Sequence, residues 1–394
     1  MQNLQRCKIK KTKMKITYLD NAATTRVDEK VAEAMKEIML EKYGNPSSLH
    51  LKGEEAKRAL DESREIIARA IGAKYNEIIF TGSGTEANNF ALKGLFFSNY
   101  PNKNHIITTK IEHDCVLNSC KWLESQGAKI TYLNVDEKGF VNPKDVENAI
   151  TDKTIVVSII HGNNEMGTIQ DLREIGRICK SKGVLLHSDA CQSFTKVPID
   201  VKRDNIDLLT LNAHKIHGPK GVGALYVRSG VKITPLLHGG GQEFKLRSST
   251  ENTPGIIGFA KAVKIASNSD VKNMKKLRDY FIQELLKIPN TKLNGAEGEE
   301  RLCNNINISF RNIEGEAIGS FLNAHGVFTS TGSACSSKSL DPSHVLLALG
   351  LSPLEANSSI RISISKYTTK EEVDYALEEI KRTVEKLRKI SPLK

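Results

Sequence analysis

The sequence of 394 residues contains no apolar run that approaches the roughly 20 residues of a membrane-spanning helix. Its first 15 residues are basic, but no apolar stretch follows them, so we expect no secretory signal there. With 39% hydrophobic and 26% charged residues, the composition is that of a soluble globular protein with about two or three domains. We expect residues 1–15 to form a flexible extension and the ordered chain to begin near Ile16.

The seven cysteines show neither CxxC spacing nor a regular framework, which argues against a disulfide scaffold and a structural zinc site. They are Cys7, Cys115, Cys120, Cys179, Cys191, Cys303 and Cys335. The sequence therefore predicts a cytoplasmic protein, in a reducing compartment and without a bound metal.

The net charge of +11 is the feature of the composition that could favour nucleic acid. Neither a nucleic-acid recognition motif nor a dense basic stripe accompanies this charge, so a solvated lysine-rich surface is the better interpretation. The same charge would also favour an acidic protein partner. We expect neither nucleic acid nor a membrane among the partners.

Short apolar runs alternate with helical patterns over the first part of the chain, which predicts an α/β fold with a parallel sheet between helices. The predicted strands cover residues 77–81, 105–109, 129–135, 154–161, 184–189, 206–211 and 222–227. The predicted helices cover residues 31–39, 54–70, 86–95 and 171–181. Side chains that follow such strands gather at the carboxyl edge of the sheet, where ligands bind.

The pattern changes after residue 250. One long predicted helix, 261–286, is followed by strands at 305–310 and 360–365, helices at 316–325 and 343–349, and a terminal helix from Lys370. A capping-box pattern, Thr369 with Glu372, opens the terminal helix. We therefore predict a large domain, 16–262, whose first residues can pack on a smaller α+β domain, 263–394.

Two residues indicate the chemistry. Lys215 lies in a Gly-Pro turn between two apolar runs, and Asp189 ends the predicted strand before them. A partly desolvated lysine amine can form a Schiff base with a carbonyl. Enzymes that use pyridoxal 5'-phosphate (PLP) need such a lysine for the aldehyde and an acidic group for the pyridine nitrogen. A lone loop lysine is more often an ordinary surface residue, but its pairing with Asp189 predicts a PLP site.

A glycine-rich turn, GSGT at 82–85, lies between a predicted strand and a predicted helix. This order points free backbone N–H groups at an anion, although the turn alone is a weak signal. His113 and Asn164 follow other strands by a few residues, and each alone is more often a satisfied polar residue than a catalyst. Their coincidence with Asp189 and Lys215 at one edge of the sheet predicts an active site.

A second chemical stretch is the loop at 329–339, TSTGSACSSKS, whose small polar residues suit mobility. Cys335 lies in this loop beside Lys338, a setting that favours the thiolate, although an incidental loop cysteine is the alternative. Arg361, in SSIRIS, is either a surface charge or a clamp for a carboxylate, which its planar guanidinium matches.

In combination, several motifs resemble those of the NifS/IscS-type cysteine desulfurases, which are PLP enzymes of fold type I. These motifs are YLDNAATT, GSGTEANN, IEHDCV, HGNNEMG, SDACQS, AHKIHGPKGVGALY, HGGGQE and TGSACSS. The resemblance extends from about Tyr18 to Pro392. It implies a mostly parallel seven-stranded sheet, a homodimer, and transfer of sulfur from L-cysteine through an enzyme persulfide. The final acceptor would be an iron–sulfur scaffold protein or a thiolation route.

The resemblance also implies roles for single residues. Lys215 would bind the PLP aldehyde, and His113 would stack on the pyridine ring. Asp189 would pair with the ring nitrogen and Gln192 with the phenolic oxygen. The phosphate would be held by Gly84, Thr85, His214 and, from the other subunit, Thr250. Asn164 and Arg361 would bind the substrate carboxylate, and Cys335 would accept the sulfur.

The sequence departs from the family pattern at two positions near the cofactor. Asn212 stands where the family usually has serine, and its amide could still donate to a phosphate oxygen. Cys191 stands before Gln192 in place of a common threonine or serine, which puts a second thiol near the cofactor.

Three alternatives remain open. A selenocysteine lyase or a PLP aminotransferase of the same fold is the alternative of related chemistry. An aminotransferase would require a 2-oxo acid and would have no use for Cys335. A non-catalytic protein with this fold is the alternative from another class, and the intact Lys215, Asp189 and His113 argue against it.

Overall fold

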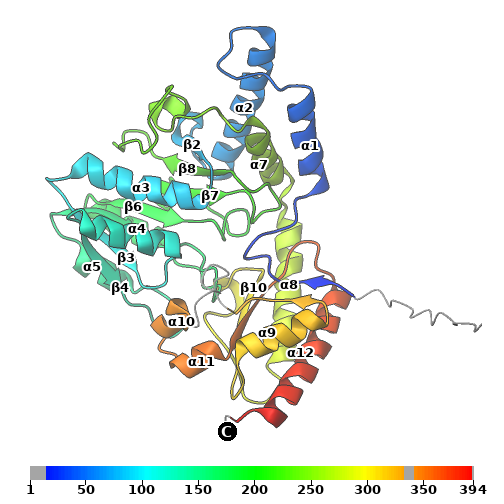
Figure 1. Cartoon of the computed structure of the whole chain (residues 1–394). Helices are drawn as coiled ribbons and strands as arrows, with labels where there is room; N and C mark the ends of the chain where they lie inside the picture. Colours follow the sequence, from blue (N-terminus) through cyan, green and yellow to red (C-terminus); the bar gives the residue numbers. More distant parts are fainter. Residues whose placement is uncertain (1–14, 332–340, 393–394) are drawn as a thin grey trace, which may run out of the picture.

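The computed structural model describes residues 15–331 and 341–392 (Figure 1). The expected extension over 1–14 and most of the loop around Cys335, at 332–340, lie outside the described residues. Within the described ranges, no helix combines the length and the apolar character needed to cross a lipid bilayer.

Seven strands form the central sheet, in the order β2-β8-β7-β6-β5-β3-β4. They are β2 (Ile78–Thr81), β3 (His105–Thr109), β4 (Lys129–Leu133), β5 (Thr154–Ser158), β6 (Leu185–Asp189), β7 (Leu208–Asn212) and β8 (Gly223–Val227). The pairs from β7 through to β4 are parallel, whereas β8 is antiparallel to both β2 and β7. The prediction of a mostly parallel seven-stranded sheet in an α/β fold is therefore confirmed.

Helices cover both faces of this sheet, which explains why its strands read as continuous apolar runs. One face packs on α2 (Leu51–Ala70), α5 (Pro143–Ala149), α6 (Leu172–Ser181) and α7 (Thr253–Ile265). The other face packs on α3 (Gly84–Asn99) and α4 (Asp114–Ser125). Helix α1 (Glu29–Leu40) lies against α7, at the top of the view in Figure 1.

A second hydrophobic core surrounds a three-stranded antiparallel sheet in the order β12-β10-β9. Its strands are β9 (Thr291–Leu293), β10 (Asn305–Phe310) and β12 (Ser359–Ser363). The helices packed on it are α8 (Asn268–Leu285), α9 (Gly315–Ala324) and α12 (Lys370–Ile390). Two further short helices are α10 (His344–Ala348) and α11 (Pro353–Asn357).

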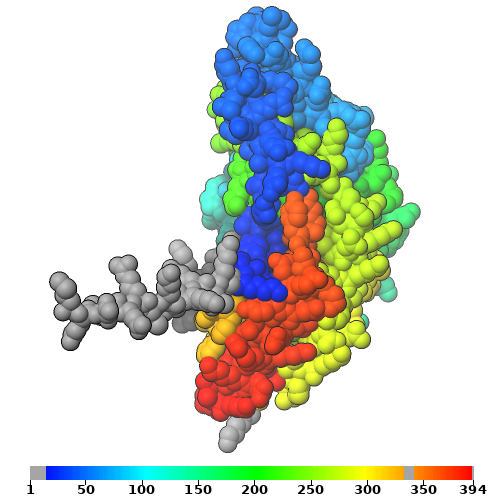
Figure 2. All heavy atoms as spheres, turned by 90° about the vertical axis from the view of Figure 1, so that its right-hand side faces the viewer, coloured from blue at the N-terminus to red at the C-terminus, as the bar shows by residue number. Residues whose placement is uncertain are grey.

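The N-terminal segment joins the two cores. Strand β1 (Thr17–Tyr18) pairs in parallel with β11 (Val327–Phe328), and Leu19 is buried in the second core. In Figure 2 this segment, in blue, runs from beside α12 towards α1. The motif YLDNAATT therefore begins at the second core and continues towards the edge of the large sheet.

The prediction of one long helix over 261–286 is wrong. The structure has two helices, α7 and α8, separated at Ala266 and Ser267. Ala266 has an extended backbone (φ −63°, ψ 137°), and the Ser267 side chain accepts a hydrogen bond from the N–H of Asp270. Because a serine that caps its N-terminus starts a new helix here, the apolar pattern of residues 261–286 is divided between two helices.

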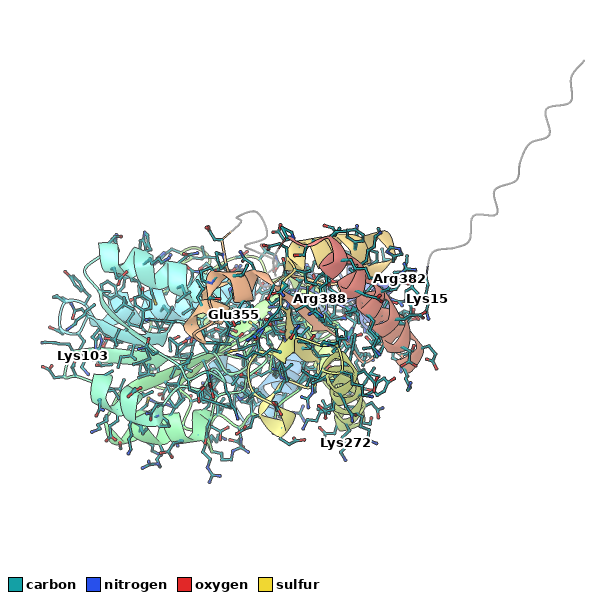
Figure 3. The ribbon with its side chains drawn as sticks, turned by 90° about the horizontal axis from the view of Figure 1, so that it is seen from below. Lys15, Lys103, Lys272, Glu355, Arg382 and Arg388 are labelled. Carbon is teal, nitrogen blue, oxygen red and sulfur yellow. The ribbon has the colours of Figure 1, made fainter. Side chains whose placement is uncertain are left out.

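The positive charge is spread over the outside of the molecule. Figure 3 shows Lys103 at one end of the molecule and Lys15 and Arg382 towards the other, with Arg388 and Lys272 on the same half as Lys15. Arg382 is paired locally with Glu379, at 2.8 Å. This distribution is that of a solvated surface.

Candidate active site

The carboxylate of Asp189, at the end of β6, is buried at the carboxyl edge of the sheet. Its Oδ1 accepts from the backbone N–H of Cys191 at 2.9 Å. Its Oδ2 accepts from Nδ2 of Asn88, a fully buried residue of α3, at 2.7 Å. These two donors fix the direction of the carboxylate on a rigid strand end.

Lys215 lies in a tight turn between β7 and β8 and is half-buried. The N–H groups of Ile216 and Gly218 both donate to the carbonyl of Ala213, which closes the turn. The Lys215 carbonyl accepts from Nζ of Lys196 at 3.2 Å, and the same Nζ donates to the Gln192 carbonyl at 2.9 Å. Lys196 therefore braces the lysine turn against the turn that follows β6.

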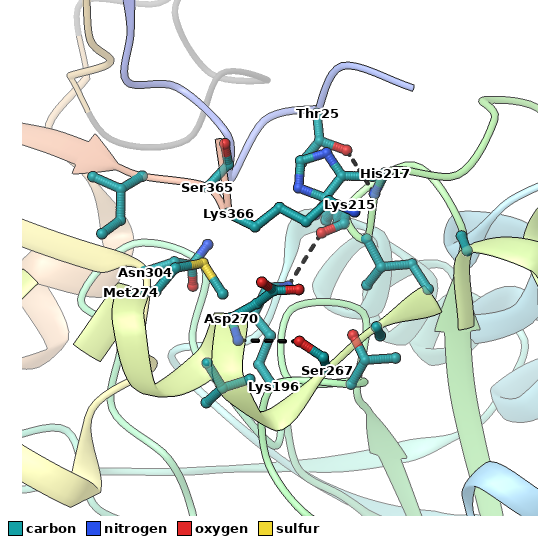
Figure 4. Close-up of a pocket in the computed structure, with 16 residues that line it drawn as sticks. Thr25, Lys196, Lys215, His217, Ser267, Asp270, Met274, Asn304, Ser365 and Lys366 are labelled. Atoms are coloured by element: carbon teal, nitrogen blue, oxygen red, sulfur yellow. Dashed lines mark hydrogen bonds between the residues drawn. The ribbon is translucent and has the colours of Figure 1, made fainter. Parts of the chain in front are cut away.

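Lys196 is a residue that the sequence did not single out. Burial, together with the nearby charge of Lys215, lowers its pKa to about 8. Figure 4 shows Lys196 reaching the Lys215 carbonyl in a cleft that Asp270 and Lys366 also line. The contact is between residues 19 positions apart, and no local pattern in the sequence announces it.

His113 forms the N-cap of α4, and its Nδ1 accepts from the backbone N–H of Cys115 at 3.2 Å. Burial lowers the pKa of His113, as does the charge of Lys215, while the charge of Asp189 acts in the opposite direction. These influences place the imidazole within electrostatic reach of both residues. The structure thus brings His113 near Asp189 and Lys215, which are three of the four residues expected to converge.

The motif YLDNAATT holds the lysine turn from the other side. The N–H and the hydroxyl of Thr25 both donate to the carbonyl of His214, at 3.0 and 2.8 Å. The His214 ring lies 3.2 Å from the Thr24 hydroxyl, and burial lowers the pKa of this histidine to about 4. His214 is therefore neutral at physiological pH. Gln192 is buried nearby and donates to the carbonyl of Ala22 at 2.8 Å.

A cradle for an anion forms where α3 begins. Ser83 caps this 16-residue helix and Gly84 is its first residue. A Cβ on Gly84 would lie 2.5 Å from Sγ of Cys191 and 3.5 Å from Nδ2 of Asn212, so only glycine fits. Asn212 ends β7 and is only 3% exposed, and its Oδ1 has no hydrogen-bond partner among the described residues. Free N–H groups at the helix start, next to a buried amide, suit a phosphate.

Because Asn212 stands beside this cradle, replacing it by serine tests its contact. We expect Asn212→Ser to change the affinity for PLP by less than about tenfold, or roughly 1.4 kcal/mol, because serine can also donate to an oxyanion. The measurement is a titration of cofactor-free protein with PLP, followed by absorbance. A much larger loss would show that the Asn212 amide has a role that a hydroxyl cannot supply.

Arg361 of β12 is buried, which excludes the alternative of a surface charge. Its guanidinium donates to Oδ1 of Asp20 at 2.9 Å and to the carbonyl of Asn164 at 3.2 Å. Arg361 Nε and Asn164 Oδ1 are both buried without a partner in the described part of the chain. The backbone of Arg361 also pairs with that of Ser330, just before the Cys335 loop. The unused Nε of Arg361 can donate to a carboxylate, and the unused Oδ1 of Asn164 can accept from a neighbouring amine.

The sequence did not predict a role for Asp20 either, although this residue lies within the motif YLDNAATT. Its pairing with Arg361 joins residues 341 positions apart. Only the fold brings them together.

Two expected residues are exposed in the described structure. Thr85 is exposed on α3, next to Gly84. Thr250 is exposed in the loop before α7 and lines a cavity with Gly82, Arg247 and Asn252. Cys335 lies outside the described residues.

The loop that leads to Thr250 is tied to the edge of the sheet by a buried ion pair. The carboxylate of Glu243 accepts two bonds from Arg64, at 2.6 and 2.7 Å, and one from the N–H of Phe80 at 2.8 Å. Removing one partner of such a pair leaves an uncompensated buried charge. The glutamate that ends the motif HGGGQE, Glu243, therefore has a structural role, because it fixes this loop to the edge of the sheet.

The groups present fit PLP. A lysine amine in the turn after β7 and a fixed carboxylate at the end of the neighbouring strand β6 match the aldehyde and the pyridine nitrogen. The start of α3 and the buried amide of Asn212, whose Nδ2 faces Gly84 and can donate, mark the phosphate end of the same site. Each chemical part of the cofactor therefore has a matching group at this edge of the sheet.

Comparisons with known proteins agree with this geometry. Residues 17–376 match the aminotransferase class-V family. The cysteine desulfurase IscS of Methanosarcina thermophila is 51% identical over 385 residues, which cover 97% of this chain and 95% of that protein. The cysteine desulfurase IscS of Dictyoglomus turgidum is 51% identical over 382 residues, with 96% of each chain covered.

Solved structures give the same result. A NifS-like protein superposes with a TM-score of 0.89 at 40% identity, over 95% of this chain and 100% of that one. A structure described as SspA in complex with cysteine superposes with a TM-score of 0.81, also at 40% identity, over 90% and 100%. The chain therefore belongs to the aminotransferase class-V family and, within it, to the cysteine desulfurases.

Proposed function

We propose that this protein is a PLP-dependent cysteine desulfurase, which converts L-cysteine to L-alanine and transfers the sulfur to Cys335. The observation that carries the proposal is the convergence of Lys215, Asp189 and His113 at the carboxyl edge of the sheet. An amine, a fixed carboxylate and a neutral imidazole in one site are the groups that such a reaction needs.

PLP would be held by residues already described. Lys215 would take the aldehyde, Asp189 the pyridine nitrogen and Gln192 the phenolic oxygen, with His113 on the ring face. Its phosphate would lie at Gly84, Thr85, Asn212 and His214, where backbone N–H groups and neutral side chains can donate. When bound there, PLP supplies an electron sink for the bonds to Cα of the amino acid.

The residues around the cofactor position would bind the substrate and move its protons. Arg361 and Asn164 would hold the carboxylate of L-cysteine, which orients Cα towards Lys215. The Lys215 amine is then placed to remove the proton from Cα. His113 is placed to exchange the proton of the substrate thiol.

The sulfur transfer is a displacement at sulfur. The Cys335 thiolate would attack the substrate sulfur and form an S–S bond, while the Cβ–S bond breaks and its electron pair returns to the carbon skeleton. Protonation of that skeleton gives alanine, and the enzyme keeps a persulfide. No external oxidant or reductant is needed for this step.

The test is to supply L-cysteine to the purified protein with a reductant and to measure alanine and sulfide. We expect the two products in equal amounts and without added 2-oxo acid. A requirement for a 2-oxo acid would identify an aminotransferase, and release of selenium from selenocysteine without release of sulfide from cysteine would identify a lyase.

We further propose a homodimer whose subunits share active sites. Helices α1 and α2 and the turn between them expose five large apolar side chains in the described structure: Met39, Leu40, Tyr43, Leu49 and Leu51. A second copy is a suitable partner for such a patch. Thr250, which is exposed in the described structure, would complete the phosphate site of the neighbouring subunit.

Mixing two inactive variants tests this arrangement. Lys215→Ala and Thr250→Ala subunits, once exchanged, should form hybrid dimers in which one site is intact, so up to about a quarter of the sites recover activity. The measurement is sulfide release after mixing, with subunit exchange verified by mass. If Thr250→Ala alone keeps full activity, or if exchanged hybrids stay inactive, the shared site is wrong.

The remaining proposals concern the setting of the enzyme. We propose a cytoplasmic location and a division into domains 16–262 and 263–394. The five cysteines of the described ranges are all free thiols, which suits a reducing compartment. We also propose that the persulfide sulfur passes to an iron–sulfur scaffold or another acceptor protein, whose acidic surface the charge of +11 would favour.

A further inference from the structure

A chain of hydrogen bonds connects Asp189 with His113 through two buried side chains. Nδ2 of Asn88 donates one hydrogen to Oδ2 of Asp189, at 2.7 Å, and the other to Sγ of Cys115, at 3.1 Å. Sγ of Cys115 in turn lies 3.1 Å from Nδ1 of His113. The carboxylate and the imidazole of the site are therefore joined through the side chains of Asn88 and Cys115.

The direction of the last bond follows from its neighbours. The backbone N–H of Cys115 donates to Nδ1 of His113 at 3.2 Å, so this nitrogen carries a lone pair and no hydrogen. Asn88 already donates to the sulfur, which leaves the thiol hydrogen free for Nδ1. The thiol is therefore the donor, and His113 carries its hydrogen on Nε2. Burial raises the pKa of the Cys115 thiol to about 12, so it keeps this hydrogen.

We propose that Cys115 is a positioning residue, whose thiol, held by Asn88, donates to Nδ1 of His113 and keeps the imidazole neutral with its hydrogen on Nε2. In this state His113 offers a donor, and it can take up a proton only at Nδ1, by giving up the bonds from Cys115. Asn88 gives Asp189 and Cys115 a common support, so the two ends of the site are oriented together. The inference rests on the proposed function only where it assigns His113 a role in the reaction.

Four other titratable groups lie close to His113 and influence its pKa. They are Lys215 from the turn after β7, Asp189 from β6, Asp114 from α4 itself and His344 from α10. A donor to the unprotonated nitrogen favours the neutral ring. Removing the thiol should therefore raise the pKa of His113, whereas removing an acceptor would lower it.

The experiment follows the His113 ring by ¹H–¹⁵N correlation spectra of the holoenzyme as a function of pH, with signals identified from His113→Gln. In the wild type we expect the hydrogen on Nε2. Cys115→Ala should raise the pKa of His113 by about one pH unit, the scale of one hydrogen bond. Cys115→Ser, whose hydroxyl can donate, should return it close to the wild-type value.

Cys120→Ala is the matched control, because Cys120 is a buried thiol of the same helix and of the same hydrophobic core. It should leave the titration of His113 unchanged. An unchanged or lowered pKa in Cys115→Ala, or a hydrogen on Nδ1 in the wild type, would overturn the proposal. The readout does not depend on sulfide release, so an inactive protein with the expected titration would refute the desulfurase proposal and still support the assignment of Cys115.

Discussion

Replacement of Lys215 by alanine is expected to abolish the release of alanine and sulfide from L-cysteine. The amine has two tasks in the proposed reaction, covalent attachment of PLP and removal of the proton from Cα. Loss of a general base alone lowers a rate by about 10²- to 10⁴-fold, and loss of the attachment adds to this. The direct measurement is reduction of the wild type with borohydride, which should fix the mass of PLP on the peptide that contains Lys215.

Lys196 provides the control for this experiment. It is a half-buried lysine next to the site, and its lowered pKa, about 8, makes its amine a competitor for an aldehyde. Its Nζ, however, already donates to the Gln192 and Lys215 carbonyls. We therefore expect Lys196→Ala to retain PLP on the Lys215 peptide after borohydride. Label on Lys196 in the wild type would show that the central assignment is wrong.

The strands of the central sheet could be predicted because burial on both faces leaves a simple signal. Runs such as 105–109 and 154–161 are apolar without interruption, and the structure has strands there, with β5 ending at Ser158. The antiparallel direction of β8 also has a local cause. The turn between β7 and β8 is too short for the crossover of a dozen or more residues that parallel neighbours require.

Helix ends were harder to predict, because they depend on single hydrogen bonds. The apolar spacing over 261–286 continues through Ala266 and Ser267, although the backbone of both residues is extended. The polar stretch after Ala266 was the available signal, since serine is a preferred N-cap. The apolar periodicity continues across this serine, so periodicity alone predicts one uninterrupted helix.

The site residues also divide into those whose place the sequence predicts and those whose place it does not. His113, Asp189, Asn212 and Lys215 lie at strand ends or in the turns after them, and a parallel sheet brings such positions together. Their supporting residues could not be predicted by this argument. Asn88 reaches Asp189 across 101 positions of the chain, and this contact exists only after α3 packs on the sheet.

Cys335, and not Cys191, is expected to carry the transferred sulfur, and the structure supports this by the state of the other thiols. Cys191 is 6% exposed, its Sγ lies against Gly84, and burial raises its pKa well above the ordinary value. Burial also raises the pKa of the remaining described thiols, Cys115, Cys120, Cys179 and Cys303. A thiol that keeps its proton at neutral pH is a poor nucleophile.

The experiment gives the protein L-cysteine without reductant and locates the added sulfur by mass spectrometry of its peptides. One extra sulfur should appear on the Cys335 peptide. Cys335→Ala should bind PLP as the wild type does but release almost no sulfide, because the substrate sulfur then has no acceptor. Cys191→Ala is the control, and its persulfide should still form on Cys335. Sulfur on the Cys191 peptide, together with full activity of Cys335→Ala, would refute the assignment, because it would require a buried, protonated thiol to act as the nucleophile.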